Sequence, residues 1–284
     1  MNTHGQLRPE RELDIAELAE EVADSHCSGL RVEPVKIIKA NDITLSFGRY
    51  ANAFDGLLEY QHGRFHIYSN LDRVEVPSAP RARFTLGHEL GHYYINEHRN
   101  ALKQGLALSH PSFCDYTSDL LVEREADHFA SYLLMPRTRF LEVAMRSPRG
   151  LAGILCLADT FCTSVTSTAI RYAKDEVEPC AVLKWENGRF AWMWLSAEMQ
   201  KDCFRRPIVY TQRLPSGSPT ARALAGEATA ARFFSAGIRT GSWFPRVGAN
   251  EGGNVPLVEQ AISLGRFGVL TFLYPESGSY NVRH

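Results

Sequence analysis

The alternation of apolar and polar residues predicts one helix and three short strands at the start of the chain. From Glu10 to Ser25, apolar residues recur at helical spacing between acidic residues, which predicts an amphipathic helix. Three β-like runs follow, and the turn-prone pair His62-Gly63 separates the last two. The runs are Ile43–Phe47, Gly56–Tyr60 and Arg64–Ser69. We expect them to form a small antiparallel sheet.

A helix from Pro80 to Ile95 is predicted next. Proline suits the first turn of a helix, and the helical pattern continues to Ile95 with only Gly87 and Gly91 as breakers. These glycines are four residues apart and share one face of the helix. We expect a neighbouring element to approach the backbone closely on that face.

A second long helix is predicted from about Ser118 to Met135, ending before Pro136. One face of it carries an apolar stripe. The stripe comprises Val122, Ala126, Phe129, Ala130 and Leu133. The opposite face is polar.

Arg137–Lys174 again has a helical pattern. Within it, Leu157–Cys162 and Val165–Lys174 flank a short break and have the proportions of a helix-turn-helix. Beyond Pro179 the pattern changes to strands, which indicates a new domain.

The C-terminal part is predicted to be an α+β unit. Its first two strands, Ala181–Trp185 and Arg189–Leu195, flank Asn187-Gly188, a strong hairpin signal. The alanine-rich segment Pro219–Gly237 predicts a helix, and Gly268–Tyr274 predicts a final strand. The fold class expected for the whole chain is therefore α+β.

Composition and charge indicate an ordinary folded protein. Hydrophobic residues make up 44% and charged residues 22%, and 31 Lys and Arg nearly balance 32 Asp and Glu, so the charge does not point to nucleic acid or to an anionic membrane. The six cysteines are scattered without a C-x-x-C pair and are typical of reduced thiols. The segment Met1–Glu12 is too polar for a signal peptide, and no stretch approaches the ~18 apolar residues of a membrane span. We expect a cytoplasmic protein.

The segment from His88 to His92 has the pattern H-E-x-x-H. On a helix, the four-residue spacing turns both imidazoles to one side, where they can bind one ion. Two neutral imidazoles and one carboxylate, with a fourth position left open, form a catalytic zinc site. Zinc makes water more acidic, so Glu89 can act as the general base that takes its proton and passes it to a leaving amine. The chemistry expected is amide hydrolysis, with manganese as an alternative metal.

The third metal ligand is predicted to be Glu123. Glu123 and Asp127 are four residues apart on the polar face of the second long helix. If Glu123 binds zinc, Asp127 can accept the second ring N–H of His88 or His92 and fix the orientation of that ring. The rival ligand is His98, whose spacing follows H-E-x-x-H-x-x-G-x-x-H, but that motif requires glycine where this chain has a β-branched isoleucine.

A hydrogen-bond donor for the tetrahedral oxyanion is also expected, and spacing does not choose among several candidates. The candidates are Tyr93, Tyr94, His98, His110 and Tyr116.

Two blocks, Arg83–His92 and Glu123–Pro136, closely resemble the ImmA/IrrE family of metallopeptidases. The resemblance implies a zincin-like, thermolysin-like fold in which His88, His92 and Glu123 bind zinc. It further implies that Glu89 is catalytic and that Asp127 supports the ligands. Family members typically cleave a helix-turn-helix transcriptional repressor at one site, which de-represses stress-response or mobile-element genes.

The resemblance extends more weakly to the rest of the chain. IrrE-type proteins have a helix-turn-helix-like segment after the peptidase and then a GAF-like domain. The implied organisation is a zinc metallopeptidase domain over residues 1–140, a helical helix-turn-helix-like region over 141–177, and a GAF-like α+β domain over 178–284. A sensing role for the last domain rests on analogy alone.

Two other classes of function compete with a peptidase. A DNA-binding regulator would use Val165–Lys174 as its recognition helix, but this segment offers only Arg171 and Lys174 as cations. A zinc-stabilised sensor or scaffold would bind zinc without hydrolysis. Glu89 argues against it, because a structural site has no use for a base.

Overall fold

The computed structural model describes residues 7–74, 76–106, 112, 120–203, 214, 217–239, 243 and 256–276. The chain divides into two compact units. Unit 1 comprises Met1–Glu142 and Ala158–Ser164, and unit 2 comprises Val143–Leu157 and Val165–His284. The three-domain organisation stays a prediction.

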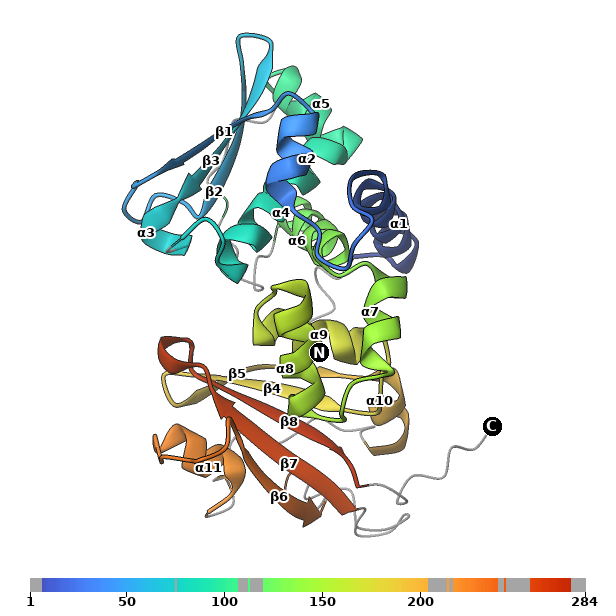
Figure 1. Cartoon of the computed structure of the whole chain (residues 1–284), viewed down its shortest axis with the longest axis vertical. Helices are drawn as coiled ribbons and strands as arrows, with labels where there is room; N and C mark the ends of the chain where they lie inside the picture. Colours follow the sequence, from blue (N-terminus) through green and yellow to red (C-terminus); the bar gives the residue numbers. More distant parts are fainter. Residues whose placement is uncertain are drawn as a thin grey trace. The chain divides into compact units, whose positions relative to one another are not determined.

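Unit 1 is built around helix α4, which lies between a small sheet and helix α6 (Figure 1). Every residue from 82 to 92 in this helix is buried, so it forms the centre of the unit and not its surface. The helices of the unit are α1 (Pro9–His26), α2 (Pro34–Ala40), α3 (Leu71–Val74), α4 (Pro80–Tyr94), α5 (Asn96–Lys103) and α6 (Leu121–Leu134). The predictions for α1, α4 and α6 are therefore confirmed, whereas α2 and α5 were not predicted.

The three predicted strands form one sheet, but it is mixed and not antiparallel. Strands β2 (Gly56–Gln61) and β3 (Arg64–Asn70) form the expected hairpin, in which His62 (φ 49°) and Gly63 (φ 80°) both have positive φ, as tight hairpin turns require. Strand β1 (Thr44–Gly48) instead pairs in parallel with β3. The prediction was wrong because the chain crosses to the far edge of β3 before β2 begins, and alternation along a strand does not reveal its partner.

The two glycines of α4 lie against α6, as expected. A Cβ atom built on Gly91 would lie 3.0 Å from the Cα of Ala126, and one on Gly87 would lie 3.3 Å from the Cβ of Ala130. The packing side of α6 is otherwise apolar and buried, although Val122, predicted to belong to it, is 40% exposed. The small residues bring the two helices close enough for their polar side chains to meet.

Gly91→Ala should destabilise the protein more than Gly87→Ala. At position 91 the added methyl group meets backbone atoms of Ala126 at 3.0 and 3.1 Å, which cannot give way easily. We expect a net loss of about 1–2 kcal/mol in the free energy of unfolding, because overpacking outweighs the roughly 1 kcal/mol gain in helix propensity. At position 87 the two effects should nearly cancel. Urea denaturation of both variants in a chelator measures the difference, and equal stabilities would contradict the close approach.

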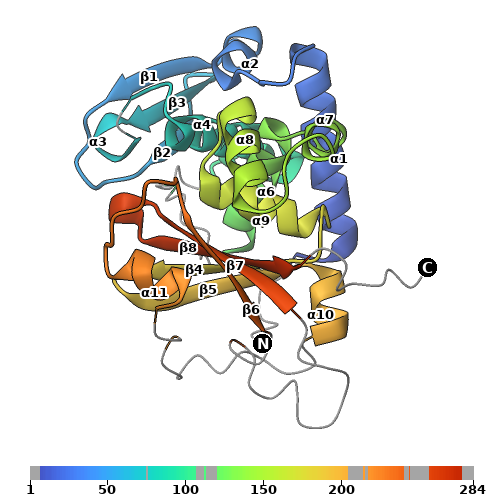
Figure 2. The ribbon, with the colours of Figure 1, turned by 60° about the horizontal axis from the view of Figure 1, so that its bottom comes forward.

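Unit 2 contains a five-stranded antiparallel sheet in the order β5-β4-β8-β7-β6 (Figure 2). The strands are β4 (Ala181–Glu186), β5 (Arg189–Leu195), β6 (Phe234–Arg239), β7 (Pro256–Ser263) and β8 (Val269–Pro275). The predicted hairpin β4–β5 and the final strand β8 are confirmed, whereas β7 was not predicted. The helices of the unit include α10 (Ala197–Cys203) and a short 3-10 turn, η1 (Gly265–Phe267).

Helices α9 (Val165–Lys174) and α11 (Pro219–Leu224) lie on opposite faces of this sheet (Figure 2). Tyr172 of α9 packs its ring on Phe272, and Thr220 of α11 hydrogen-bonds to the adjacent Thr271 at 2.7 Å. Adjacent residues of a strand point to opposite faces. The sheet is thus covered by a helix on each side.

The prediction of a helix over Pro219–Gly237 is correct only for its first residues, Pro219–Leu224, and wrong beyond them. Helix α11 ends before Gly226, which has a positive φ of 71° that favours glycine and ends helices. From Phe234 onward the chain pairs with β7 as an edge strand instead. Pairing with a distant strand outweighs the local helix propensity of an alanine-rich segment.

Helices α7 (Arg137–Ala144) and α8 (Leu151–Phe161) each have residues in both units. Among the described residues, no single helix has the length and apolar character needed to cross a bilayer, and only the α8–α9 pair, bent by 112°, passes that test jointly. Helix α8 begins earlier than the Leu157 predicted for the first helix of a helix-turn-helix. That motif and the GAF-like assignment stay predictions.

Candidate metal centre

Helix α4 brings His88, Glu89 and His92 together inside unit 1. Pro80 begins the helix and Ile95 ends it, with an extended backbone at φ −70° and ψ 112°. His88 and Glu89 are 0% exposed and His92 is 3% exposed. Buried polar side chains of this kind require partners, and α6 supplies carboxylates for the two histidines.

Glu123 of α6 completes a compact cluster with the two histidines. The Nε2 atoms of His88 and His92 are 3.1 Å apart, and the Glu123 carboxylate oxygens lie 3.3 Å from the first and 3.4 Å from the second. One donor atom from each of the three residues lies within 4.8 Å of the others. These are the three metal ligands predicted from the sequence.

The spacing of these donor atoms fits a tetrahedral zinc ion. Ligand atoms about 2.0–2.1 Å from zinc in tetrahedral directions lie roughly 3.4 Å from one another. The two imidazole nitrogens are 3.1 Å apart, and each lies 3.3 or 3.4 Å from a different carboxylate oxygen of Glu123, so these separations are close to this value. The donor set, two imidazoles and one carboxylate, is also that of a catalytic zinc site with an open fourth position.

Asp127 lies one helical turn after Glu123 and contacts the far side of the His88 ring. Its Oδ1 atom is 2.8 Å from His88 Nδ1, which donates the hydrogen bond when Nε2 binds a metal. Burial lowers the pKa of His88, but hydrogen bonds to Asp127 and Glu123 outweigh it and raise this pKa to about 10. Burial lowers the pKa of His92 to about 3. Without metal, His88 is therefore the ring that carries the extra proton.

Zinc binding should release about one proton per ion at pH 7–8. A metal ligand must be deprotonated, and a pKa of about 10 keeps His88 protonated in the metal-free protein at this pH. The apparent zinc affinity should therefore rise about tenfold per pH unit and level off above the pKa of His88. Calorimetric titration with zinc in buffers of different ionisation enthalpy measures the released proton. A binding enthalpy that does not depend on the buffer would contradict the protonation of His88.

Glu89 borders a small cavity beside His92. The cavity has a volume of about 10 Å³ and is lined by Leu58, Glu89, His92, Leu102 and Ser112. This is close to the space that one water molecule occupies. A Cβ atom on Gly56 would lie 2.5 Å from Glu89 Oε1, so the start of β2 approaches this carboxylate with no side chain between them. Glu89 thus adjoins the cluster of donor side chains and a cavity the size of a water molecule.

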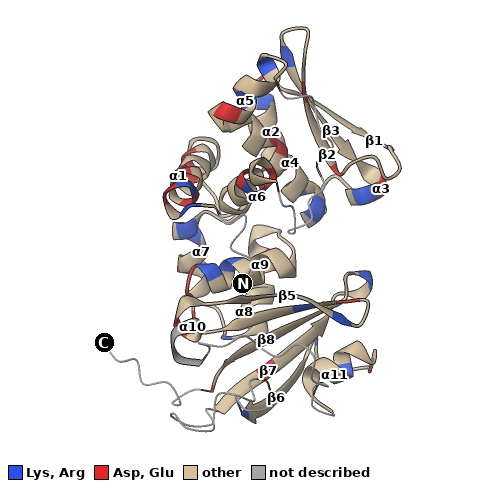
Figure 3. Cartoon of the chain, turned by 180° about the vertical axis from the view of Figure 1, so that it is seen from behind, with Lys and Arg blue, Asp and Glu red and all other residues tan. Residues whose placement is uncertain are grey.

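His98 of α5 is not one of the clustered donors, although its spacing made it the rival ligand. It lies behind His92, with Nδ1 3.2 Å from His92 Nδ1 and Nε2 2.9 Å from Glu125 of α6. Arg11 of α1 holds Glu125 in turn, and Figure 3 shows the charged residues of these three helices near one another. Glu125 and Arg11 were not identified from the sequence, because no spacing rule links them to the motif.

The remaining candidates for an oxyanion donor have structural contacts or lie outside the described residues. Tyr93 packs edge-on against Phe65 at 5.1 Å, and the Tyr94 hydroxyl accepts a hydrogen bond from Asn41 at 2.7 Å. His110 and Tyr116 are not among the described residues. An oxyanion donor is therefore not assigned.

Comparison with known proteins places this site in a family. Residues 75–171 match the family model of the IrrE N-terminal-like domain, an M78-type peptidase domain. This part of the chain is an IrrE N-terminal-like domain. The matched segment contains all the clustered donors, Glu89 and Asp127.

Similarity over the whole chain is limited to the fold. A solved structure of a Mycobacterium tuberculosis transcriptional regulator is similar, with a TM-score of 0.57 and 11% sequence identity, over 94% of this chain and 78% of that one. No curated protein sequence matches the chain significantly. The IrrE N-terminal-like domain is thus the part for which sequence evidence and site geometry coincide.

Proposed function

We propose that the protein is a zinc-dependent endopeptidase. His88, His92 and Glu123 hold the metal, Asp127 orients His88, and Glu89 is the general base. The observation that carries the proposal is the spacing of the three donor atoms beside a buried glutamate in an IrrE N-terminal-like domain. Zinc is the expected metal, with manganese as the alternative.

The catalytic roles follow from the positions of the side chains. When bound, zinc supplies Lewis-acid activation of water and of a carbonyl group. Glu89 takes the proton of the attacking water and passes it to the nitrogen of the leaving amine, so the peptide bond breaks with a net addition of water. The Glu89 side chain is 0% exposed, so bulk water does not compete for the proton that it carries from the attacking water to the leaving amine.

The proposed substrate is a protein, and specifically a helix-turn-helix transcriptional repressor cut at one site. This choice rests on the family resemblance, and the cut would de-repress stress-response or mobile-element genes. We assign specificity to docking on the helical region 141–177 and the GAF-like region 178–284, with residues 1–140 as the peptidase domain. Both assignments are part of the proposal, as is a cytoplasmic location.

The test is incubation of the zinc-loaded protein with the product of a neighbouring repressor-like gene, followed by mass spectrometry of the fragments. One clean cut that disappears with a chelator supports the proposal. Binding of zinc and of the repressor without any fragment would support a scaffold and overturn the peptidase.

A DNA-binding regulator is the second candidate, favoured by the name of the mycobacterial structure and by the α8–α9 pair. The contacts of α9 support it less. The Arg171 side chain is 0% exposed and pairs with Asp175 at 2.8 Å, and the Lys174 ammonium lies 4.6 Å from the centre of the Trp194 ring. A recognition helix needs free cations for phosphate contacts. Salt-dependent binding to duplex DNA that a chelator does not change would favour this candidate.

A further inference from the structure

The two histidines of the His88–His92–Glu123 cluster are supported in different ways. The His88 ring contacts a carboxylate directly, through Asp127 at 2.8 Å. The His92 ring contacts a second imidazole, His98, and the carboxylate of Glu125 follows only behind that ring. Both carboxylates belong to α6, so His98 fills the gap between His92 and Glu125.

The hydrogen-bond direction through His98 is fixed if His92 binds metal. The Nε2 atom of His92 faces His88 and Glu123 and is the atom that would bind the metal. Its Nδ1 atom therefore carries the proton and donates the hydrogen bond. The Nδ1 atom of His98, 3.2 Å away, must then accept. Its own proton is on Nε2 and points to Glu125 at 2.9 Å. Every donor in this chain meets an acceptor, and all groups keep their ordinary charge.

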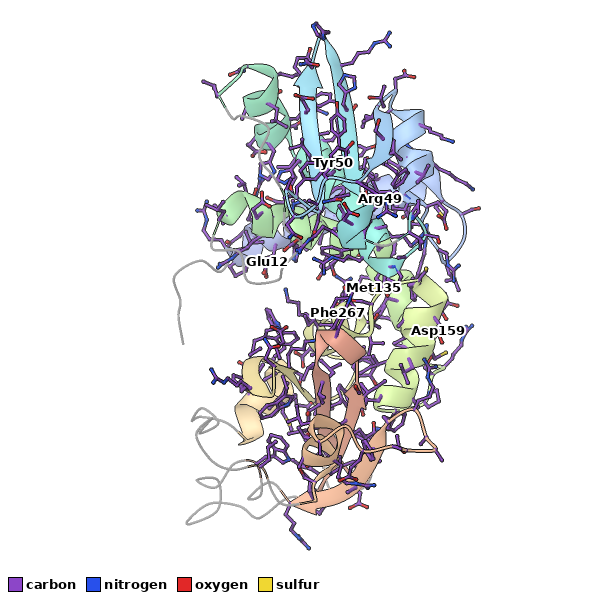
Figure 4. The ribbon with its side chains drawn as sticks, turned by 90° about the vertical axis from the view of Figure 1, so that its left-hand side faces the viewer. Glu12, Arg49, Tyr50, Met135, Asp159 and Phe267 are labelled. Carbon is purple, nitrogen blue, oxygen red and sulfur yellow. The ribbon has the colours of Figure 1, made fainter. Side chains whose placement is uncertain are left out.

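The last group in this series of hydrogen bonds is the Glu125 carboxylate, and side chains from α1 and α5 hold it on α6. Arg11 of α1 donates two hydrogen bonds to Glu125, from Nε at 2.8 Å and from Nη2 at 3.0 Å, and a third to Glu97 of α5 at 3.3 Å. Two hydrogen bonds to one carboxylate fix its orientation more firmly than a single bond does. Helix α1 is also joined to α6 where His128 Nε2 donates to the backbone carbonyl of Glu12, labelled in Figure 4, at 2.9 Å.

We propose that His98 is a positioning residue of the metal centre. Held by Glu125 and Arg11, it fixes the tautomer and ring orientation of His92. His98 is 8% exposed and is not a donor of the cluster, so it acts only through His92. The inference rests on the proposed metal site. It adds to that site a hydrogen-bonded chain extending from His92 to the N-terminal helix.

The test compares two substitutions of similar size, of which only one keeps a hydrogen-bond acceptor. His98→Leu removes the acceptor for His92, whereas His98→Asn can place its side-chain oxygen near the position of Nδ1. Loss of a residue that orients a metal ligand costs about 10–100-fold in metal affinity. We expect this loss in zinc affinity for His98→Leu, and a change of less than about threefold for His98→Asn.

The measurements are zinc affinity by competition with a chelator and metal-free stability by urea denaturation. His128→Leu is the matched control, because it removes another buried histidine, which donates to α1 and is not one of the clustered donors. It should lower stability and leave zinc affinity unchanged. Unchanged zinc affinity in His98→Leu, or an equal loss in His98→Asn, would overturn the role of His98. Absence of zinc binding by the wild-type protein would instead overturn the proposed metal site itself.

Discussion

Replacing Glu89 by glutamine should lower the rate of peptide cleavage by about 10²–10⁴-fold while leaving the metal centre intact. Glutamine has nearly the shape of glutamate but cannot take a proton from water. Glu89 is not among the clustered donor atoms, so zinc should still bind with a stoichiometry of one. The measurements are the initial rate of substrate cleavage and the zinc content of the purified variant.

The control for this variant is Glu97→Gln on the neighbouring helix α5. The Glu97 side chain is 67% exposed and forms an ion pair with Arg11 at 3.3 Å, away from the clustered donors, so cleavage should proceed at the normal rate. A Glu89→Gln protein that cleaves as fast as the wild type would rule out Glu89 as the base. A variant that has lost its zinc would show that Glu89 holds the metal and would contradict the assigned roles.

The centre of the site follows from local sequence. His88, Glu89 and His92 lie on one helix, and a four-residue spacing fixes the relative directions of the side chains whatever surrounds them. Glu123 and Asp127 are a second pair of this kind on α6. The contact between the two pairs could be expected because Gly87 and Gly91 let α6 approach α4.

The support of His92 does not follow from local sequence. Ile95 has an extended backbone with negative φ, so α5 starts in a new direction without the glycine turn of the rival motif. This direction brings His98 behind His92, on its Nδ1 side. Glu125 and Arg11 join it from segments that are more than a hundred residues apart in the sequence. Contacts of this kind depend on how several helices pack together.

The same distinction explains the fold. The hairpins β2–β3 and β4–β5 are closed by short turns with positive φ, at His62-Gly63 and Asn187-Gly188, and the turn residues themselves predict them. The parallel pairing of β1 with β3 and the edge strand β6 depend on distant partners. Local sequence patterns alone gave the wrong result in both places.

Replacing Glu123 by glutamine should weaken zinc binding by more than about 100-fold. Mutation of a residue that only supports a ligand already lowers metal affinity by about 10–100-fold, and Glu123 is itself a proposed ligand. Glutamine keeps the shape of the side chain but removes the charge of the carboxylate oxygens that lie 3.3 and 3.4 Å from the histidine Nε2 atoms. Asp127→Asn is the milder variant for comparison. Asparagine keeps a hydrogen-bond acceptor for His88, so zinc affinity should fall only about tenfold.

Thermal or urea denaturation at fixed zinc concentration gives an independent measure of the same effect. At a zinc concentration 100 times its Kd, the wild-type protein should gain about 2.7 kcal/mol in free energy of unfolding. A variant whose Kd is 100-fold higher should gain only about 0.4 kcal/mol at that concentration. If Glu123→Gln kept the full gain, the carboxylate would not be a ligand. The two imidazoles would then need another third partner, and the assignment of the base at Glu89 would have to be made again from that partner's position.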